Sequence, residues 1–429
     1  MKKFLALFLA LVMLTCLFAG CAKDESEKGS VYFLNFKPEA DSAWQTLAKT
    51  YTEKTGVPVK VVTAASGSYS ETLTAEMAKD ENAPTLFQCG NLAGLETWKE
   101  YCLALDGTDF LKEMTTDDFN LKGADGKTYC AGYCYEAFGI ITNTALLEKA
   151  GYTVADITDF ASLKKVAEDI TARSAELGFS AFTSAGLDGS SSWRFSGHLA
   201  NMPLYYEGVK ADSATITGEH LDWYKNIWDL YINNSTCTPD TLATKTGDES
   251  EAEFATGKAV FFQNGTWEYA NLVTDEKKAF YMNADDLAML PIYCGADGEA
   301  DAGICCGTEN CWAVNAKASP ANQKATLDFM KWVVTSDEGT KMMAEQFGPI
   351  PFKAAKESEN VLFNDANKLM ADGKYTVTWV FNYTPNVDDW RAGVVSALTA
   401  YSAGTGDWAA VETAFVAGWE QQYKIQNGG

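Results

Sequence analysis

The chain has 429 residues, 47% of them hydrophobic, and a formal net charge of −24 at pH 7. This length is enough for two domains, and the apolar share is that of a globular chain. A surface this acidic repels phosphate backbones and anionic lipid head groups. The charge therefore argues against nucleic acid as a partner and against a membrane-binding protein face.

The first residues have the pattern of a secretory signal. Lys2 and Lys3 precede an apolar run at 4–14, and small residues close the segment before position 21. The run is too short, and too soon followed by charge, to span a membrane. We predict a signal peptide over residues 1–20.

A cysteine stands at the end of this signal. The residues "FAGC" (18–21) resemble the bacterial lipobox, which implies cleavage before Cys21 and attachment of a diacylglyceryl group and an acyl chain such as palmitate. Residues 21–30 are rich in charged and small residues, which is typical of a solvated tether. The alternative is secretion of a soluble product with an incidental Cys21.

The first folded stretch alternates between strands and helices. Apolar residues at Trp44, Leu47, Ala48 and Tyr51 have helical spacing. Turn residues separate this helix from β-prone segments, which we expect at 31–36, 57–64 and 85–90, with a further helix at 69–79. Alternation of this kind predicts an α/β fold with a largely parallel sheet.

The alternation continues through the middle of the chain. We expect a buried strand at 258–267, which runs into an Asn-Gly turn, and a long amphipathic helical region at 320–346. Further helices are predicted at 162–176, 219–233 and 249–256. No long linker divides the chain into contiguous halves, which is compatible with two domains interleaved by several crossings.

Familiar catalytic motifs are missing from the sequence. The two histidines, His198 and His220, are in no HExxH pattern, and no nucleophile elbow, phosphate loop or dinucleotide fingerprint occurs. We therefore expect no catalytic residue, no cofactor and no metal. Paired carboxylates for glycoside hydrolysis remain open, because 58 acidic residues bring some pairs close by abundance alone.

Nine of the 11 cysteines remain once Cys16 and Cys21 are set aside. Nine is an odd number, so they cannot all form disulfides, and no zinc-knuckle spacing is present. We expect most of them to be buried free thiols that pack as small apolar groups.

Several of the 12 tryptophans stand next to turn or polar residues, among them Trp193, Trp267, Trp379 and Trp390. The flat face of such a ring packs on sugar C–H groups while neighbouring polar groups bind hydroxyls. The alternative for each is packing in a core. Core packing is the interpretation for the tryptophans in helical segments: Trp44, Trp98, Trp223, Trp228 and Trp332.

Three segments carry a family resemblance: "GYCYEAFGIITNTALLEKAGY" (132–152), "FATGKAVFFQNGTWEYA" (254–270) and residues 311–352, which begin "CWAVNAKASP" and end "FGPIPF". They resemble the extracellular solute-binding proteins of carbohydrate ABC importers, the class of maltose-binding protein. The resemblance implies a two-lobed periplasmic-binding-protein-like fold of type II, with hinge strands between the lobes and the ligand in the cleft.

Mapped onto this chain, the resemblance divides it into interleaved lobes. The first lobe is expected at 31–140 and 305–346, and the second at 141–304 and 347–429. The crossings are expected near 138–143, 304–314 and 347–352.

The resemblance also implies ligand-binding positions. Trp267 and Trp390 match aromatic stacking positions of the second lobe, with Trp193 near a third. For Glu136 the alternative is a structural salt bridge, and for Lys37 a solvated loop lysine. The full predicted set is Trp267, Trp390, Trp193, Glu136, Asn91, Lys37, Phe36 and Arg194.

The predicted function is that of a monomeric, lipid-anchored receptor at the outer face of a bacterial cell membrane. It captures an oligosaccharide or a disaccharide and delivers it to ABC permease subunits that work with a separate ATPase. No bond is made or broken, and the membrane is contacted through the lipid alone. The alternatives are a receptor for a polyamine or a phosphate ester, and a surface glycoside hydrolase.

Overall fold

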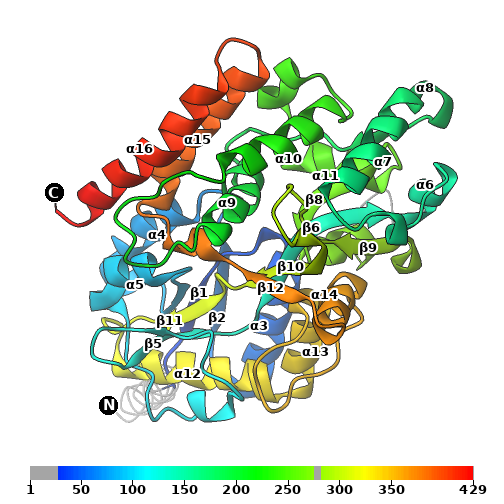
Figure 1. Cartoon of the computed structure of the whole chain (residues 1–429). Helices are drawn as coiled ribbons and strands as arrows, with labels where there is room; N and C mark the ends of the chain where they lie inside the picture. The colour runs from blue at the N-terminus through cyan, green and yellow to red at the C-terminus, as the bar shows by residue number, and fades with distance from the viewer. Residues whose placement is uncertain (1–27, 275–281, 429) are drawn as a thin grey trace, which may run out of the picture.

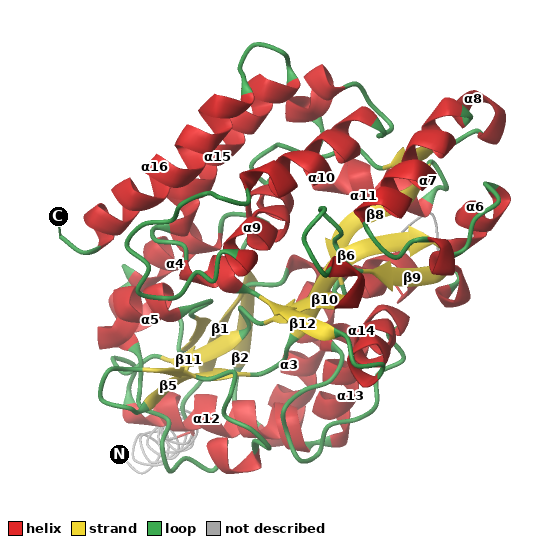
Figure 2. Ribbon diagram, viewed as in Figure 1, coloured by secondary structure: helices red, strands yellow, loops and turns green. Residues whose placement is uncertain are grey.

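The computed structural model describes residues 28–274 and 282–428 (Figure 1). The predicted signal peptide, Cys16 and the predicted lipidation site Cys21 lie outside the described residues. Two sheets organise the described chain, each with helices packed against it (Figure 2). None of the helices in this part of the chain combines the length and hydropathy that crossing a bilayer requires.

The first sheet has the strand order β2-β1-β3-β11-β5-β4. β1 pairs in parallel with β2 and β3, whereas β11 is antiparallel to β3 and β5. The strands are β1 (Val31–Asn35), β2 (Val59–Thr63), β3 (Leu86–Gln88), β4 (Leu121–Lys122), β5 (Thr128–Gly132) and β11 (Cys311–Val314).

The predicted helical stripe on the first sheet is confirmed. Helix α3 (Asp41–Thr55) buries Trp44, Leu47, Ala48 and Tyr51. It ends at Gly56, whose φ of 72° is the left-handed conformation that glycine adopts without strain. The buried side of α3 thus covers the strands that precede and follow it in the chain.

The second sheet has the order β12-β10-β6-β8-β7, and β9 pairs with β6. Most of its pairings are antiparallel, so only part of the predicted parallel arrangement holds across the molecule. Its strands are β6 (Glu136–Asn143), β7 (Ser180–Phe182), β8 (Ala259–Gly265), β9 (Leu287–Leu290), β10 (Ala302–Gly307) and β12 (Tyr375–Thr378).

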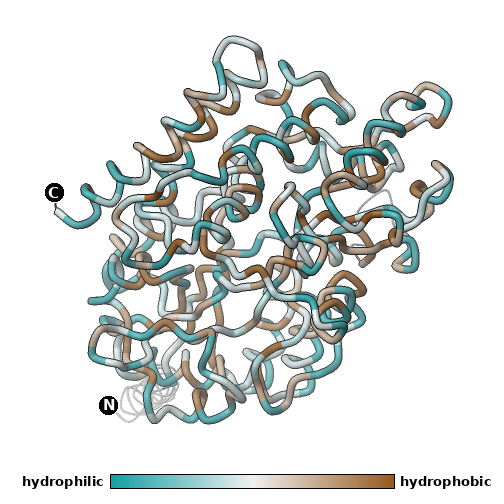
Figure 3. Tube along the Cα trace, viewed as in Figure 1, coloured by the Kyte–Doolittle hydropathy of each residue, from teal (hydrophilic) through white to brown (hydrophobic). Residues whose placement is uncertain are grey.

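The helices cover both sheets, and apolar segments follow the strands beneath them (Figure 3). The predicted helical region at 320–346 forms two helices, because the side chain of Ser336 caps the second by accepting from the Gly339 N–H. The helices besides α3 are α4 (Tyr69–Met77), α5 (Leu92–Trp98), α6 (Thr144–Lys149), α7 (Phe160–Ala172), α8 (Ser174–Leu177), α9 (Ala200–Tyr206), α10 (Leu221–Asn233), α11 (Gly247–Ala255), α12 (Pro320–Thr335), α13 (Asp337–Phe347), α14 (Val361–Ala371), α15 (Val387–Ser402) and α16 (Trp408–Gln426).

The chain passes between the sheets more than once. It leaves the first sheet after β5, enters the second at β6, and returns between β10 and β11. β6 pairs with β8, β9 and β10, all in the second sheet. The first passage therefore lies at 133–135, just before the strand in which the sequence placed it, and the return lies at 308–310.

Trp390 belongs to helix α15 and lies in the core, and α15 runs beside α16 in Figure 1. Its side chain is 2% exposed, its ring meets Phe415 edge to face at 4.8 Å, and its indole N–H donates to the Phe415 carbonyl at 2.9 Å. The residues "NVDDW" lie at the start of helix α15, and the Trp390 ring packs against α16. This placement contradicts the predicted sugar-stacking role of Trp390.

Replacing Trp390 with alanine should therefore destabilise the fold. Loss of a buried tryptophan leaves a cavity and typically costs ~3–5 kcal/mol. Urea denaturation of Trp390→Ala should show that loss in the free energy of unfolding. The matched variant Trp223→Ala, at a ring that is only partly buried, should lose less; equal stability of wild type and Trp390→Ala would contradict the assignment.

Candidate functional site

A buried ion pair joins the two sheets. Lys37 follows β1, and its amine lies 2.8 and 2.9 Å from the two carboxylate oxygens of Glu136, the first residue of β6. The loop that presents Lys37 is fixed by Asn35, whose amide donates to the Lys37 carbonyl and accepts from the Lys37 N–H. Lys37 is 6% exposed, which contradicts the alternative of a solvated loop lysine.

Further polar groups complete the surroundings of this pair. The Asn310 amide donates to Glu136 at 2.6 Å, and the Tyr133 hydroxyl donates to Asn310 at 3.2 Å. Burial lowers the pKa of Lys37, but the carboxylates of Glu136 and Glu39 raise it by more, so the amine stays charged. Glu136 is thus a salt-bridge partner, which was the alternative for this residue, and it lies beside the aromatic groups described next.

An aromatic wall from the second sheet lies against the ion pair. The Lys37 amine is 4.9 Å from the Trp267 ring centroid, and the Trp193 ring is 6.0 Å from Trp267. Trp267 follows β8 and folds back over its last residue; a Cβ at Gly265 would lie 2.2 Å from the ring. Only glycine at 265 leaves room for the indole in this position.

Two more aromatic residues extend the wall. His198 stacks on Phe138 with ring centroids 3.9 Å apart and lies 5.5 Å from Trp267. Trp379, which follows β12, lies 6.5 Å from Trp267 and 5.2 Å from Phe138. From the sequence, Trp379 was identified as a tryptophan next to polar residues. His198 was not predicted to belong to the site, because it is positioned by segments that are distant in the sequence.

Several buried polar atoms at this end of the second sheet have no hydrogen-bond partner within the described residues. They include the Trp379 indole nitrogen, the Asn382 side-chain oxygen and the Arg391 Nε. Asn382 also donates to the Thr308 carbonyl at 3.1 Å, which places it at the return passage between the sheets. Buried polar groups without partners are uncommon, and they give this region unused capacity to hold a polar ligand.

The remaining predicted residues have mixed placements. Phe36 lies 5.7 Å from the Lys37 amine and packs edge to face on Tyr69, so it borders the site. Asn91 uses its side-chain oxygen to cap α5, accepting from the Gly94 N–H at 2.8 Å. The cap occupies this oxygen and not the amide N–H groups, so the ligand-binding role of Asn91 stays a prediction.

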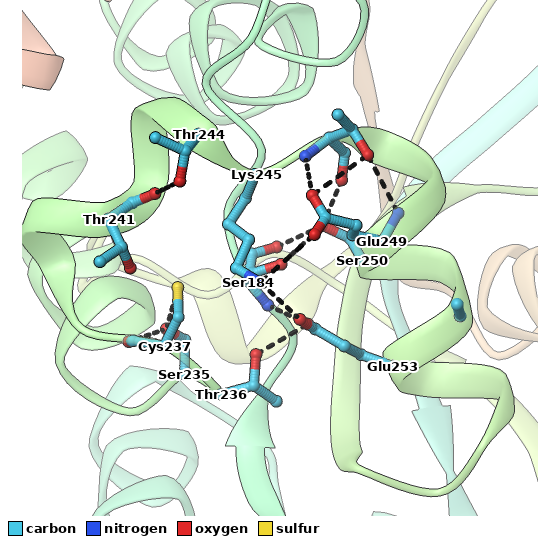
Figure 4. A network of polar contacts seen from close by, with 12 residues as sticks. Ser184, Ser235, Thr236, Cys237, Thr241, Thr244, Lys245, Glu249, Ser250 and Glu253 are labelled. Carbon is cyan, nitrogen blue, oxygen red and sulfur yellow. Dashed lines mark hydrogen bonds and ion pairs between the residues drawn. The ribbon is translucent and has the colours of Figure 1, made fainter.

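The Arg194 side chain is buried beside the second sheet. It is 1% exposed and donates to the Gln263 carbonyl at 3.1 Å and the Ser250 hydroxyl at 3.3 Å. Ser250 belongs to the polar network shown in Figure 4, where it meets Ser184. Two N–H groups of Arg194 are thus bonded to protein acceptors, and its use as a ligand donor stays a prediction.

The pKa values of two acidic side chains near the aromatic wall are raised. Burial, helped by the charge of Glu251, raises the pKa of Glu268 to about 8, and the Asn264 amide donates to it at 2.7 Å. Burial also raises the pKa of Glu309, which lies in the return passage. A carboxyl with a pKa of about 8 is mostly neutral at pH 7, which limits the negative charge around the ion pair.

The two sheets also meet at loops beyond Trp193. The Ser66 hydroxyl, in the loop after β2, donates to the Ser190 carbonyl at 2.9 Å. A Cβ at the neighbouring Gly67 would lie 2.5 Å from the Gly189 carbonyl oxygen. Two α/β units that meet around one polar and aromatic site define a two-lobed binding protein.

The comparisons with known proteins give the family. The family model described as "Bacterial extracellular solute-binding protein" matches residues 46–371, and the chain belongs to this family. No curated protein matches it. The fold is the two-lobed type II fold of solved binding proteins.

Three solved structures illustrate the likeness. RafE in complex with raffinose has a TM-score of 0.69 and 16% identity, with 92% of this chain and 99% of that chain covered. GacH of Streptomyces glaucescens has a TM-score of 0.67 and 19% identity, covering 93% and 98%. A family 1 extracellular solute-binding protein from Bifidobacterium longum subsp. infantis has a TM-score of 0.60 and 17% identity, covering 92% and 100%.

The site predicts a pH dependence of stability. Burial, together with the charges of Arg391 and Arg194, holds the pKa of His198 well below its usual value. The unfolded chain therefore binds this proton more readily, so the contribution of His198 is complete above pH ~6.5 and is lost as the pH falls, at about 1.4 kcal/mol per pH unit. Denaturation between pH 7.5 and 5 should show a shallower decline for His198→Gln than for wild type.

The matched control for this measurement is His220→Gln, because His220 stacks on Trp223 outside the site. It should keep the wild-type decline. A His198→Gln protein with the wild-type slope would contradict the burial of a neutral imidazole.

Proposed function

We propose that this protein is the substrate-binding protein of an ABC importer, which captures a sugar, an oligosaccharide in particular, between its two lobes. The observation that carries the proposal is the placement of Trp267 and Trp193 beside the buried Lys37–Glu136 pair. Flat aromatic faces next to charged hydrogen-bonding groups suit the mixed apolar and polar surface of a sugar ring.

The known ligands of the structural neighbours support this class of ligand. RafE is described in complex with raffinose, GacH with acarbose, and another neighbour as a chitin oligosaccharide binding protein. A further neighbour, AcbH, is described with a preference for β-D-galactopyranose. These ligands range from one sugar to several, and the length of the aromatic wall, from Trp193 to Trp379, favours more than one ring here.

The charges favour a neutral ligand over the two charged alternatives. A polyamine needs free carboxylates, yet Glu136 already binds the Lys37 amine and the Asn310 amide. A phosphate ester needs free cations, and Lys37 is not one, because Glu136 and Glu39 neutralise it. Sugar hydroxyls can add to such a pair without leaving a charge unpaired.

The proposed mechanism is closure of two lobes over the ligand. We assign one lobe to the first sheet and its helices, close to the predicted 31–140 and 305–346, and the other to the second sheet, close to 141–304 and 347–429. Ligand contacts to both lobes stabilise the closed state relative to the open one. The closed receptor, a monomer, then delivers the sugar to the permease, whose ATPase is a separate chain.

We assign no catalytic step to this site. A glycoside hydrolase needs a general acid and a second carboxylate flanking the bond to be cleaved. Glu136, the carboxylate at the centre of the site, accepts hydrogen bonds on both oxygens from the Lys37 amine and the Asn310 amide, so neither oxygen is left free for a glycosidic bond.

Sugar binding is tested by calorimetry with α- and β-linked oligosaccharides. Trp267→Ala should weaken the best ligand by ~1–3 kcal/mol, about 5- to 150-fold in Kd, through loss of ring stacking. Trp223→Ala, a tryptophan outside the site, is the matched control and should keep wild-type affinity. Binding of amines or phosphate esters with no saccharide bound would overturn the ligand class, and released reducing ends would overturn the binding-only role.

The proposed lipid anchor generates a separate prediction. Cys21→Ser removes the thiol that would carry the diacylglyceryl group, so the full-length protein expressed in a bacterium should move from the membrane fraction to the soluble fraction. One acyl chain alone gives only marginal membrane binding, whereas several give stable anchoring. Mass spectrometry of the wild-type N-terminus should find lipid on Cys21; an unmodified Cys21 in the membrane fraction would refute the anchor.

A further inference from the structure

Three buried thiols gather on the first sheet, outside the proposed sugar site. Cys89 follows β3, Cys102 follows the short helix η3 (Lys99–Tyr101), and Cys130 lies in β5. Their sulfur atoms all lie within 4.8 Å of one another, and the Cys89 and Cys102 sulfurs are 4.0 Å apart. Each of the three residues is 5% exposed or less.

The strand pairing of the first sheet holds these thiols together. β3 and β5 both pair with β11, which places Cys89 and Cys130 on strands that flank the same neighbour. Cys102 forms a bridge with Asn315, just past the end of β11. The three thiols are therefore held by backbone pairing around one strand, and they belong to one apolar cluster.

No local pattern in the sequence indicates this cluster. The three cysteines are separated by 13 and 28 positions, which matches no zinc-binding spacing, and the prediction was packing without a metal. The cluster arises from contacts between segments that the topology brings together. The sequence also predicted that most of the nine cysteines after Cys21 are buried free thiols, and seven of the nine are buried and free.

We propose that Cys89, Cys102 and Cys130 form a three-sulfur binding site for copper(I). Thiolates are soft ligands that select Cu(I) and zinc over hard cations. Three sulfurs placed evenly around an ion at a metal–sulfur distance of ~2.3 Å lie ~4.0 Å from one another, which is the separation of Cys89 and Cys102. The Cys130 sulfur needs to move by less than an ångström to complete the triangle.

The number of ligands favours Cu(I) over zinc. Structural zinc sites take four ligands in a tetrahedron. Within the described ranges, the group contains three cysteines and no histidine or carboxylate. Each thiol that coordinates the ion gives its proton to solvent, so binding of one Cu(I) releases protons, and the ion links β3, β5 and η3 in the folded state.

The site is tested on the mature chain, reduced and handled without oxygen, by titration with Cu(I) against a colorimetric Cu(I) chelator. Wild type should bind one equivalent, with a thiolate-to-copper absorption band and three sulfur neighbours in X-ray absorption. Cys89→Ser, Cys102→Ser and Cys130→Ser should each weaken binding at least tenfold. Cys306→Ser and Cys237→Ser, two partly buried thiols outside the cluster, are matched controls that should bind as wild type does.

Folding is followed in the same samples by circular dichroism and thermal denaturation. Cu(I) should raise the Tm of wild type and of the control variants but not of the three cluster variants, because an ion that binds only the folded state stabilises it. If a cluster variant does not fold, Cys102→Ala is used in its place, because Cys102 is the most exposed of the three.

Three results would overturn the proposal. The first is equal loss of Cu(I) binding in control and cluster variants, which indicates binding by scattered thiols. The second is binding of Zn²⁺ without binding of Cu(I). The third is a Cys89–Cys102 disulfide in protein isolated from the cell surface, because two of the three ligands would then be consumed.

Discussion

The ion pair between Lys37 and Glu136 is the constraint on which the site depends. One partner follows the first strand of the first sheet, and the other begins the strand by which the chain enters the second sheet. Both are nearly excluded from water, and a buried charge that loses its partner is strongly destabilising. Contact between the two sheets at this point is therefore more stable with the pair made, and the Trp267 ring centroid lies 4.9 Å from the lysine amine.

The same pair sets the chemical character of the site. Because Glu136 accepts from both Lys37 and Asn310, the site offers polarised hydrogen-bonding groups with little net charge. Hydrogen bonds to charged groups contribute about 1.5–3 kcal/mol, roughly twice as much as neutral ones. A neutral, hydroxyl-rich molecule can use them without introducing a charge of its own, which is why the pair and the aromatic wall point to the same ligand class.

Local patterns in the sequence predicted local structure well. The stripe on α3 and the strand at 258–267 follow from periodicity, and Trp267 follows from the turn after that strand. Trp390 was misplaced because a tryptophan after two acidic residues looks the same in a loop and in the first turn of a helix. His198 was missed because its partner Gln263 is 65 positions away, and such pairings leave no local pattern.

The passages between the sheets contain residues of the site itself. Tyr133 lies in the first passage and Asn310 in the return passage. The Tyr133 hydroxyl donates to Asn310, and the Asn310 amide donates to Glu136. Any rotation of one lobe against the other changes these short segments first. In the proposed receptor, a ligand that bonds to Glu136 or Asn310 therefore contacts the hinge directly. The difference between its affinities for the closed and the open state sets how far the population shifts toward the closed state.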